Sequence, residues 1–198
     1  MQGVIVARLG LTASAVHDAA VDLADADGLD AVTISAVARR LGIRPASMYA
    51  HVRNIGALLD DLHRRGLAEL GRLIADAVAG RSGWDALEGF ATAHRRFAEG
   101  HPGLWQAVQR PASAEIAASP EAGQVAGLAL AVLRGYGLTD DAAIHATRFV
   151  GSTVNGFVTL TEAGSFGHRP VDLDTSWTQC LDAIDRALRS WPRETTEA

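Results

Sequence analysis

The 198-residue sequence contains no lysine, so all 18 of its basic residues are arginine. It has a single cysteine, Cys180, which excludes an intramolecular disulfide, and we expect that thiol to be buried and inert. No apolar run approaches the roughly 20 residues that span a bilayer. The first residues, MQGVIVARLGLTAS, lack the charged start and long apolar core of a signal peptide. We therefore expect a soluble, cytoplasmic protein without a membrane partner.

Patterns typical of catalysis or metal binding are also missing. The seven histidines include no HxxxH pair, and there is no second cysteine to complete a metal site. GxSxG, P-loop and GxGxxG motifs do not occur. The net charge is −5 and the pI is about 5.8, so any nucleic-acid binding must depend on local charge. We expect no cofactor, no metal and no enzymatic activity.

The stretch from Thr33 to Asn54 has the pattern of two short helices joined by a tight turn. One apolar face recurs at the spacing i, i+3, i+4 and i+7, formed by Ile34, Val37, Ala38 and Leu41. Thr33 precedes this face and suits a helix N-cap. Gly42 suits the left-handed residue that ends a helix, and Pro45 suits the first turn of the next one. We expect the second helix to run from Pro45 to about His51.

The charge of this region is locally positive. No Asp or Glu occurs from Ala31 to Leu59, whereas four arginines do: Arg39, Arg40, Arg44 and Arg53. A helix pair with an acid-free basic surface favours contact with DNA phosphates and bases, although a helical hairpin with a solvated basic face is the alternative. The candidate DNA-contacting residues are Thr33, Arg44, Ala46, Ser47, Tyr49, His51 and Arg53. The residues expected to pack inward are Ile43, Met48 and Val52.

The run VTISAVARRLGIRPASMYAHVRNIGALLDDL resembles the helix-turn-helix signature of TetR-family transcriptional repressors. The resemblance extends from Leu11 to about Leu62 and includes the Leu-Gly turn, a Tyr late in the second helix and a His two residues later. Ile55 stands where the family usually has a phosphate-contacting lysine, so the resemblance places phosphate anchoring on Arg53 and Arg44. It implies a double-stranded DNA operator as a partner.

The remainder of the chain predicts further helices and no strands. The expected helices cover residues 12–28, 54–79, 84–99, 104–109, 120–134, 139–163 and 174–190, with a loop over residues 164–172. Together with the short pair they make about nine helices. The predicted fold is all-α, with a three-helix DNA-binding domain over residues 1–53 and a larger helical effector-binding and dimerisation domain over residues 54–198.

The second half of the chain extends the resemblance. The segments HPGLWQAV at 101–108 and VGSTVNGFVTLTEAGSFG at 150–167 look like the ligand-binding region of a TetR subgroup with a Trp-His-Gly-type motif, although this chain has Val154-Asn155-Gly156 there. The resemblance implies a cavity for a small-molecule effector. The candidate ligand-binding residues are His94, Phe97, His101, Trp105, Gln106, Gln109, Phe149 and Asn155. The alternative for each is ordinary packing, with His94 a satisfied core histidine.

The last two expected helices predict a homodimer. The final helix has a long apolar stripe, and the preceding helix has small or short residues at helical spacing. The candidate interface residues are Ser152, Gly156, Thr159, Trp177, Leu181, Ile184 and Leu188. Repeating this pair about a two-fold axis would make a self-complementary four-helix interface. The alternative is that both faces are covered inside one subunit.

These observations favour a ligand-responsive repressor that binds a palindromic operator as a homodimer and is released by a small-molecule effector. Two-fold symmetry would place the two recognition helices about 34 Å apart, as successive major grooves require. Two alternatives remain open: a DNA-binding dimer without an effector, and a small helical enzyme that uses the C-terminal pocket.

Overall fold

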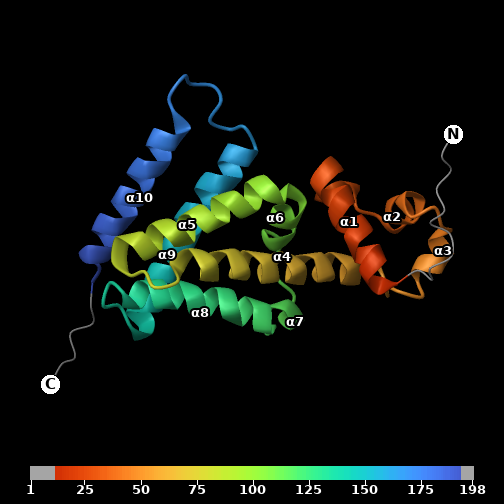
Figure 1. The fold of residues 1–198 in the computed structure, drawn as a ribbon, viewed down its shortest axis with the longest axis horizontal. Coiled ribbons are helices and arrows are strands. Elements are labelled where there is room, and N and C mark those ends of the chain that lie inside the picture. Colours follow the sequence, from red (N-terminus) through yellow and green to blue (C-terminus); the bar gives the residue numbers. More distant parts are fainter. Residues whose placement is uncertain (1–11, 193–198) are drawn as a thin grey trace. The chain divides into compact units, whose positions relative to one another are not determined.

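The computed structural model describes residues 12–192, which form ten α-helices, one 3-10 turn and no strand (Figure 1). The elements are α1 (Ala13–Asp27), η1 (Leu29–Ala31), α2 (Ile34–Arg40), α3 (Pro45–Met48), α4 (Ile55–Val78), α5 (Gly83–Gly100), α6 (Pro102–Val108), α7 (Ala114–Ala117), α8 (Pro120–Arg134), α9 (Asp140–Glu162) and α10 (Leu173–Arg189). The all-α prediction is confirmed.

Two compact units divide the chain. Unit 1 contains the residues up to Gly66 together with His101–Ile116, and unit 2 contains Leu67–Gly100 together with the residues from Ala117 onward. Helix α4 therefore begins in unit 1 and ends in unit 2. The predicted division between residues 53 and 54 concerns function and stays a prediction, whereas the compact units group α6 with the first three helices.

Most helix ends follow the caps that the sequence indicates. The hydroxyl of Thr33 accepts the N–H of Ala36 (3.1 Å), and Asn54 Oδ1 accepts the N–H of Ala57 at the start of α4 (2.9 Å). Several details differ from the prediction, among them the start of α6 at Pro102 rather than Leu104 and the unpredicted 3-10 turn Leu29–Ala31. Helix α3 ends at Met48 rather than near His51, and the following residues 49–51 form turns. The four-residue α7 was not predicted, because one turn is too short to show a periodic apolar face.

In unit 1, α1 packs against α2 and against α6. Val16 and Ala20 on α1 and Val37 on α2 are fully buried, so the apolar faces expected from the sequence meet. The start of α6 lies very close to the end of α1: a Cβ added to Gly103 would be 2.3 Å from the backbone carbon of Ala24. Glycine is required there because no side chain fits between the two helices.

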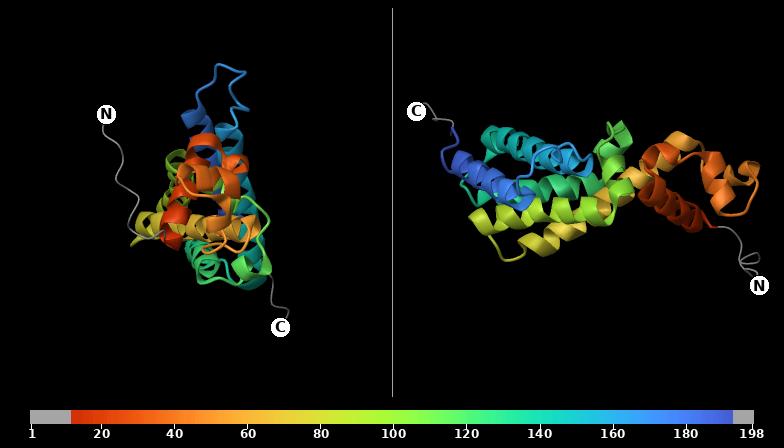
Figure 2. Two further views of the ribbon diagram at one scale, coloured as in Figure 1. Left: turned by 90° about the vertical axis from the view of Figure 1, so that its right-hand side faces the viewer. Right: turned by 90° about the horizontal axis from the view of Figure 1, so that it is seen from above.

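Unit 2 is a bundle in which α5 packs against α8, α9 and α10, and α9 also packs against α8 and α10 (Figures 1 and 2). Its core includes the fully buried Leu87, Phe97, Val154 and Leu188. Gly89 lets α5 approach the last turns of α4, since a Cβ there would be 2.6 Å from the carbonyl oxygen of Ala77. Among the described residues, no helix is long and apolar enough to cross a membrane.

Candidate functional site

The turn between α2 and α3 sets the geometry of the predicted helix-turn-helix. Gly42 has a φ of 69°, in the left-handed region that glycine adopts without strain. Its N–H donates to the carbonyl of Arg39 (3.1 Å), and the N–H of Ile43 donates to the carbonyl of Ala38 (3.0 Å). These paired bonds are the Schellman arrangement, which ends α2 and directs the chain into α3.

Buried side chains fix which face of α3 is presented to solvent. Met48 is 0% exposed and Val52 is 5% exposed, so both anchor this segment in the core of unit 1. Tyr49, by contrast, is 61% exposed. The other candidate DNA-contacting residues are exposed at Thr33, Arg44, Ala46, Ser47 and Arg53 and half-buried at His51. The local fold thus presents the candidate residues toward solvent, where a DNA groove could reach them.

The arginines of this surface differ in whether a carboxylate already compensates them. Arg40 pairs with Asp22 on α1 at 3.5 Å, an exposed contact that contributes little. Arg39, Arg44 and Arg53 have no carboxylate partner within residues 12–192. Three exposed guanidinium groups are therefore available for phosphate oxygens. Arg39 was not among the candidates, although the acid-free window already included it.

Four of the eight candidate ligand residues lie in unit 1, on or beside α6. The side-chain oxygen of Gln106 accepts the N–H of Leu29 (2.8 Å), just after α1 ends. Asp25 accepts the N–H of Gly103 (2.8 Å), and its other oxygen lies 3.7 Å from Nδ1 of His101. Trp105 is 3% exposed and Gln109 is exposed. The bonds made by Gln106 and Asp25 therefore hold α6 against the end of α1 and the turn that follows it.

The other four candidate ligand residues lie in unit 2. His94 is 4% exposed, its Nδ1 lies 2.8 Å from the carbonyl oxygen of Phe90, and burial lowers its pKa to about 4. The ring is therefore neutral at pH 7, and Nδ1 donates to that carbonyl. Phe97 is fully buried, and Phe149 contacts Trp191 with ring centroids 5.4 Å apart. His94 and Phe97 thus have the surroundings of core residues, whereas Phe149 is half-buried.

Asn155, the fourth candidate in unit 2, has a buried polar atom without a hydrogen-bond partner among residues 12–192. Its Oδ1 is buried and accepts no hydrogen bond from the described residues. A buried acceptor without a donor is unfavourable, so a ligand or partner group that donates a hydrogen bond would be stabilised there. Asn155 is the candidate whose surroundings best fit a recognition role.

The candidate dimer residues also fall into two groups. Trp177, Leu181, Ile184 and Leu188 on α10 are at most 6% exposed within the chain itself. The apolar stripe of α10 is covered by its own unit, so the reason for expecting a partner chain at these four residues is removed. On α9, Ser152 and Thr159 are exposed, and a Cβ added to Gly156 would meet nothing within 4 Å.

One feature of unit 2 was missed from the sequence. A hollow of about 220 Å³ lies at the connection between α9 and α10, lined by Phe157, Phe166 and Arg169 among others. The loop over residues 164–172 has no periodic pattern that would show which of its side chains meet α9, so only the tertiary structure brings them together.

Comparisons with known proteins agree with these observations. The family profile described as "Bacterial regulatory proteins, tetR family" matches residues 16–62, and "Tetracyclin repressor-like, C-terminal domain" matches residues 87–184. An uncharacterized HTH-type transcriptional regulator of Bacillus subtilis, YobS, is 33% identical over 164 residues, covering 80% of this chain and 83% of the relative. The Mycobacterium tuberculosis regulator Rv0681 is 30% identical over 196 residues, covering 94% of this chain and 84% of the relative.

Solved structures agree on the fold. A TetR variant from Acinetobacter baumannii AYE in complex with minocycline has a TM-score of 0.72 and 24% sequence identity, and the alignment covers 92% of this chain and 99% of that one. At this level of identity the similarity establishes the fold alone.

Proposed function

The chain belongs to the TetR family of bacterial regulatory proteins, and from that premise we propose that it is a ligand-responsive repressor that binds a palindromic operator as a homodimer. In this proposal residues 1–53 contact DNA in the cytoplasm, and residues 54–198 bind the effector and the partner chain. The curated relatives are transcriptional regulators, so the chain is a regulator and not an enzyme. Membership of the Trp-His-Gly subgroup stays a prediction.

The observation that best supports operator binding is the uncompensated charge around α3. Arg39, Arg44 and Arg53 are exposed and lack carboxylate partners in the described part of the chain, in a protein whose net charge is −5. The hydrogen-bonded turn at Gly42 sets the backbone path between Arg39 and Arg44. A fixed, locally positive helix pair on an acidic protein favours a polyanion as its partner.

Effector release follows from linkage. A ligand weakens DNA binding only if it binds the non-binding conformation more tightly than the binding one. Helix α4 is a continuous helix of 24 residues that begins one residue after Asn54 and ends in unit 2. A change in the orientation of α4 would therefore move α3, the proposed recognition helix of each subunit. The minocycline complex of the Acinetobacter protein supports a ligand-binding role by analogy.

The decisive experiment is selection of genomic DNA fragments by the purified chain, followed by fluorescence anisotropy on the enriched sequence. We expect a two-fold symmetric site, with affinity that falls steeply as salt concentration rises. Enrichment of no sequence, with equal affinity for all fragments, would contradict a specific repressor.

A thermal-shift screen distinguishes the ligand-responsive repressor from the alternative, a DNA-binding dimer without an effector. A ligand that binds the folded chain raises its apparent stability by mass action. Compounds that stabilise the protein are then tested for release of the selected operator. Stabilisation without release would favour the alternative.

A further inference from the structure

The hollow at the connection between α9 and α10 combines an apolar wall with a basic rim. Phe157, Phe166, Val171 and Leu173 form the wall, and His168, Arg169 and Ser176 complete the lining. Its volume of about 220 Å³ is smaller than that of most drug-sized sites and suits a compound with a single ring. None of the eight candidate ligand residues is part of this lining.

The wall is built around Phe157 of α9. Its ring centroid lies 5.4 Å from that of Phe166 in the loop and 5.1 Å from that of Trp177 on α10, with tilted rings in both pairs. Val171 is 64% exposed beside these rings. A flat apolar group placed here would remove exposed apolar surface from water and contact aromatic faces, and both effects are favourable.

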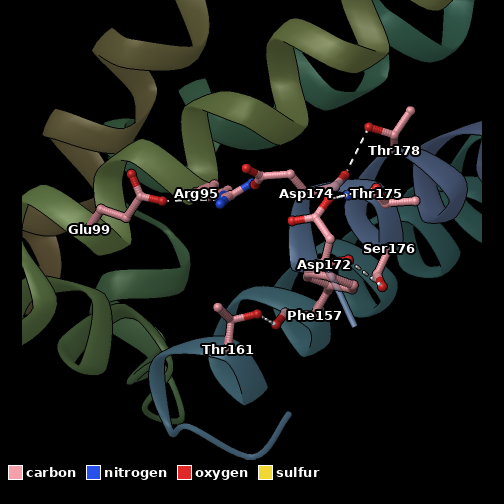
Figure 3. A network of polar contacts seen from close by, with 9 residues as sticks. All are labelled: Arg95, Glu99, Phe157, Thr161, Asp172, Asp174, Thr175, Ser176 and Thr178. Atoms are coloured by element: carbon pink, nitrogen blue, oxygen red, sulfur yellow. Dashed lines mark hydrogen bonds and ion pairs between the residues drawn. The ribbon is translucent and has the colours of Figure 1, made fainter. Parts of the chain in front are cut away.

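Two acidic residues close to this loop, Asp172 and Asp174, are already engaged in hydrogen bonds or ion pairs (Figure 3). Asp172 accepts the N–H of Thr175 (2.8 Å) and its hydroxyl (2.6 Å), and these bonds hold the pKa of that carboxyl below its usual range. Arg95 donates to Asp174 (2.7 Å) and to Glu99 (3.0 Å). Asp172 therefore caps α10, Asp174 links α10 to α5 through Arg95, and Glu99 bonds within α5.

Arg169, by contrast, has no carboxylate partner among residues 12–192. Its guanidinium forms no ion pair with any of residues 12–192, and no Asp or Glu lines the hollow. Nδ1 of His168, on the same rim, faces the carbonyl oxygen of Ser165 at 2.9 Å. An exposed guanidinium at the edge of an aromatic wall favours a planar anion, because two parallel N–H donors match a carboxylate.

We propose that this hollow binds a small aromatic carboxylate, with the carboxylate on Arg169 and the ring against Phe157 and Phe166. This deepens the proposed function by naming the chemical class of effector and its site. The proposal rests on the proposed repressor function only where it predicts an effect on operator binding. Binding of the carboxylate itself can be measured on the full chain without an operator.

Binding is tested by NMR or calorimetry with benzoate and phenylacetate, using benzamide as the uncharged control. We expect both acids to bind and benzamide to bind about tenfold more weakly, in line with the strength of charge-assisted hydrogen bonds. Equal binding of benzamide and benzoate, or no binding of either acid at millimolar concentration, would overturn the proposal. This comparison uses the unmodified chain and does not depend on any variant folding.

The site is located with two matched variants. Arg169→Gln is expected to weaken benzoate binding about tenfold. Arg134→Gln, which removes an exposed arginine at the end of α8 in the same unit, is expected to leave it unchanged. Equal loss in both variants, or none in Arg169→Gln, would overturn the assignment. Benzoate binding that weakens as protein concentration rises would mean that a second copy covers the hollow, which also overturns it.

A final measurement separates this site from the proposed function. If benzoate binds through Arg169 but leaves operator affinity unchanged, the anion site stands and its role as an effector site fails. If no operator exists at all, the proposed function fails while the binding result still decides the site.

Discussion

At the scale of single residues, the exposed arginines of unit 1 should separate base recognition from phosphate attraction. Arg44→Ala is expected to weaken operator binding by about 1–3 kcal/mol and to relax sequence preference, because Arg44 directly precedes α3. Arg53→Ala is expected to weaken all sequences alike and to reduce the salt dependence by about one counterion. Fluorescence anisotropy over a salt series measures both effects.

The matched control for these variants is Arg186→Ala, an exposed arginine on α10 in unit 2. Its operator affinity should equal that of the unmodified chain. Unchanged affinity in Arg44→Ala and Arg53→Ala, with folding intact, would contradict the assignment of this surface.

The buried His94 predicts that stability falls in mild acid. Its pKa is lowered by burial from 6.5 to about 4, so below pH 6.5 the unfolded chain binds a proton that the folded chain does not. Stability is therefore fully present above pH 6.5 and decreases as the pH falls toward 4, by about 2 kcal/mol between pH 7.5 and 5. His63, whose pKa burial also lowers, adds to the loss in the same direction.

Urea unfolding at these two pH values measures the effect. His94→Gln removes the titrating group and should reduce the difference between the two pH values, even if it lowers stability at both. His145→Gln, at an exposed position on α9, is the control and should leave the difference in place. An identical pH dependence in His94→Gln and the unmodified chain would show that His94 does not contribute.

At the scale of elements, the contact between α6 and α1 depends on Gly103. A side chain there would overlap the backbone of Ala24, with a Cβ 2.3 Å from its carbonyl carbon, so Gly103→Ala must push α6 away from α1. We expect a loss of about 2–3 kcal/mol of unfolding free energy, typical of overpacking. Gly127→Ala on α8 has open space around it and should instead gain about 0.5–1 kcal/mol.

Chemical unfolding followed by circular dichroism compares the two glycine variants. Opposite signs are the expected result, since both replacements favour the helix and only one meets a neighbouring backbone. A Gly103→Ala protein as stable as Gly127→Ala would mean that α6 does not pack on α1 as described.

At the scale of the whole molecule, we expect a homodimer that uses the open face of α9. Ser152 and Thr159 are exposed there, together with Ile144 at 44% and Leu160 at 45%. Replacing both Ser152 and Thr159 by Arg should give folded monomers in sedimentation equilibrium and weaken operator binding, since a palindromic site needs two recognition helices. Leu181→Arg is unsuitable as a test because Leu181 is 2% exposed and its replacement would unfold unit 2.

An unmodified chain that remains monomeric at micromolar concentration would contradict the dimer prediction. A double variant that remains dimeric would show that another surface is used.

The sequence by itself determined the local structure and the family. Caps such as Thr33, the Gly42 turn and the apolar periodicity act over a few residues, so the helix-turn-helix could be predicted before its packing was known. The acid-free window likewise indicated the basic surface. The confirmed all-α fold and TetR membership depend on these short-range signals.

Only the tertiary structure decided what each helix face contacts. The α10 stripe is apolar whether its own unit or a partner chain covers it. Leu181 is buried within the chain, so its own unit covers this position. The sequence alone allows Gln106 to be a ligand-binding residue or a structural one. In the structure its side chain bonds to Leu29, a residue 77 positions earlier in the chain. The hollow beside Arg169 likewise joins a loop to α9 and α10. Such contacts depend on how distant segments pack, and no local pattern in the chain specifies them.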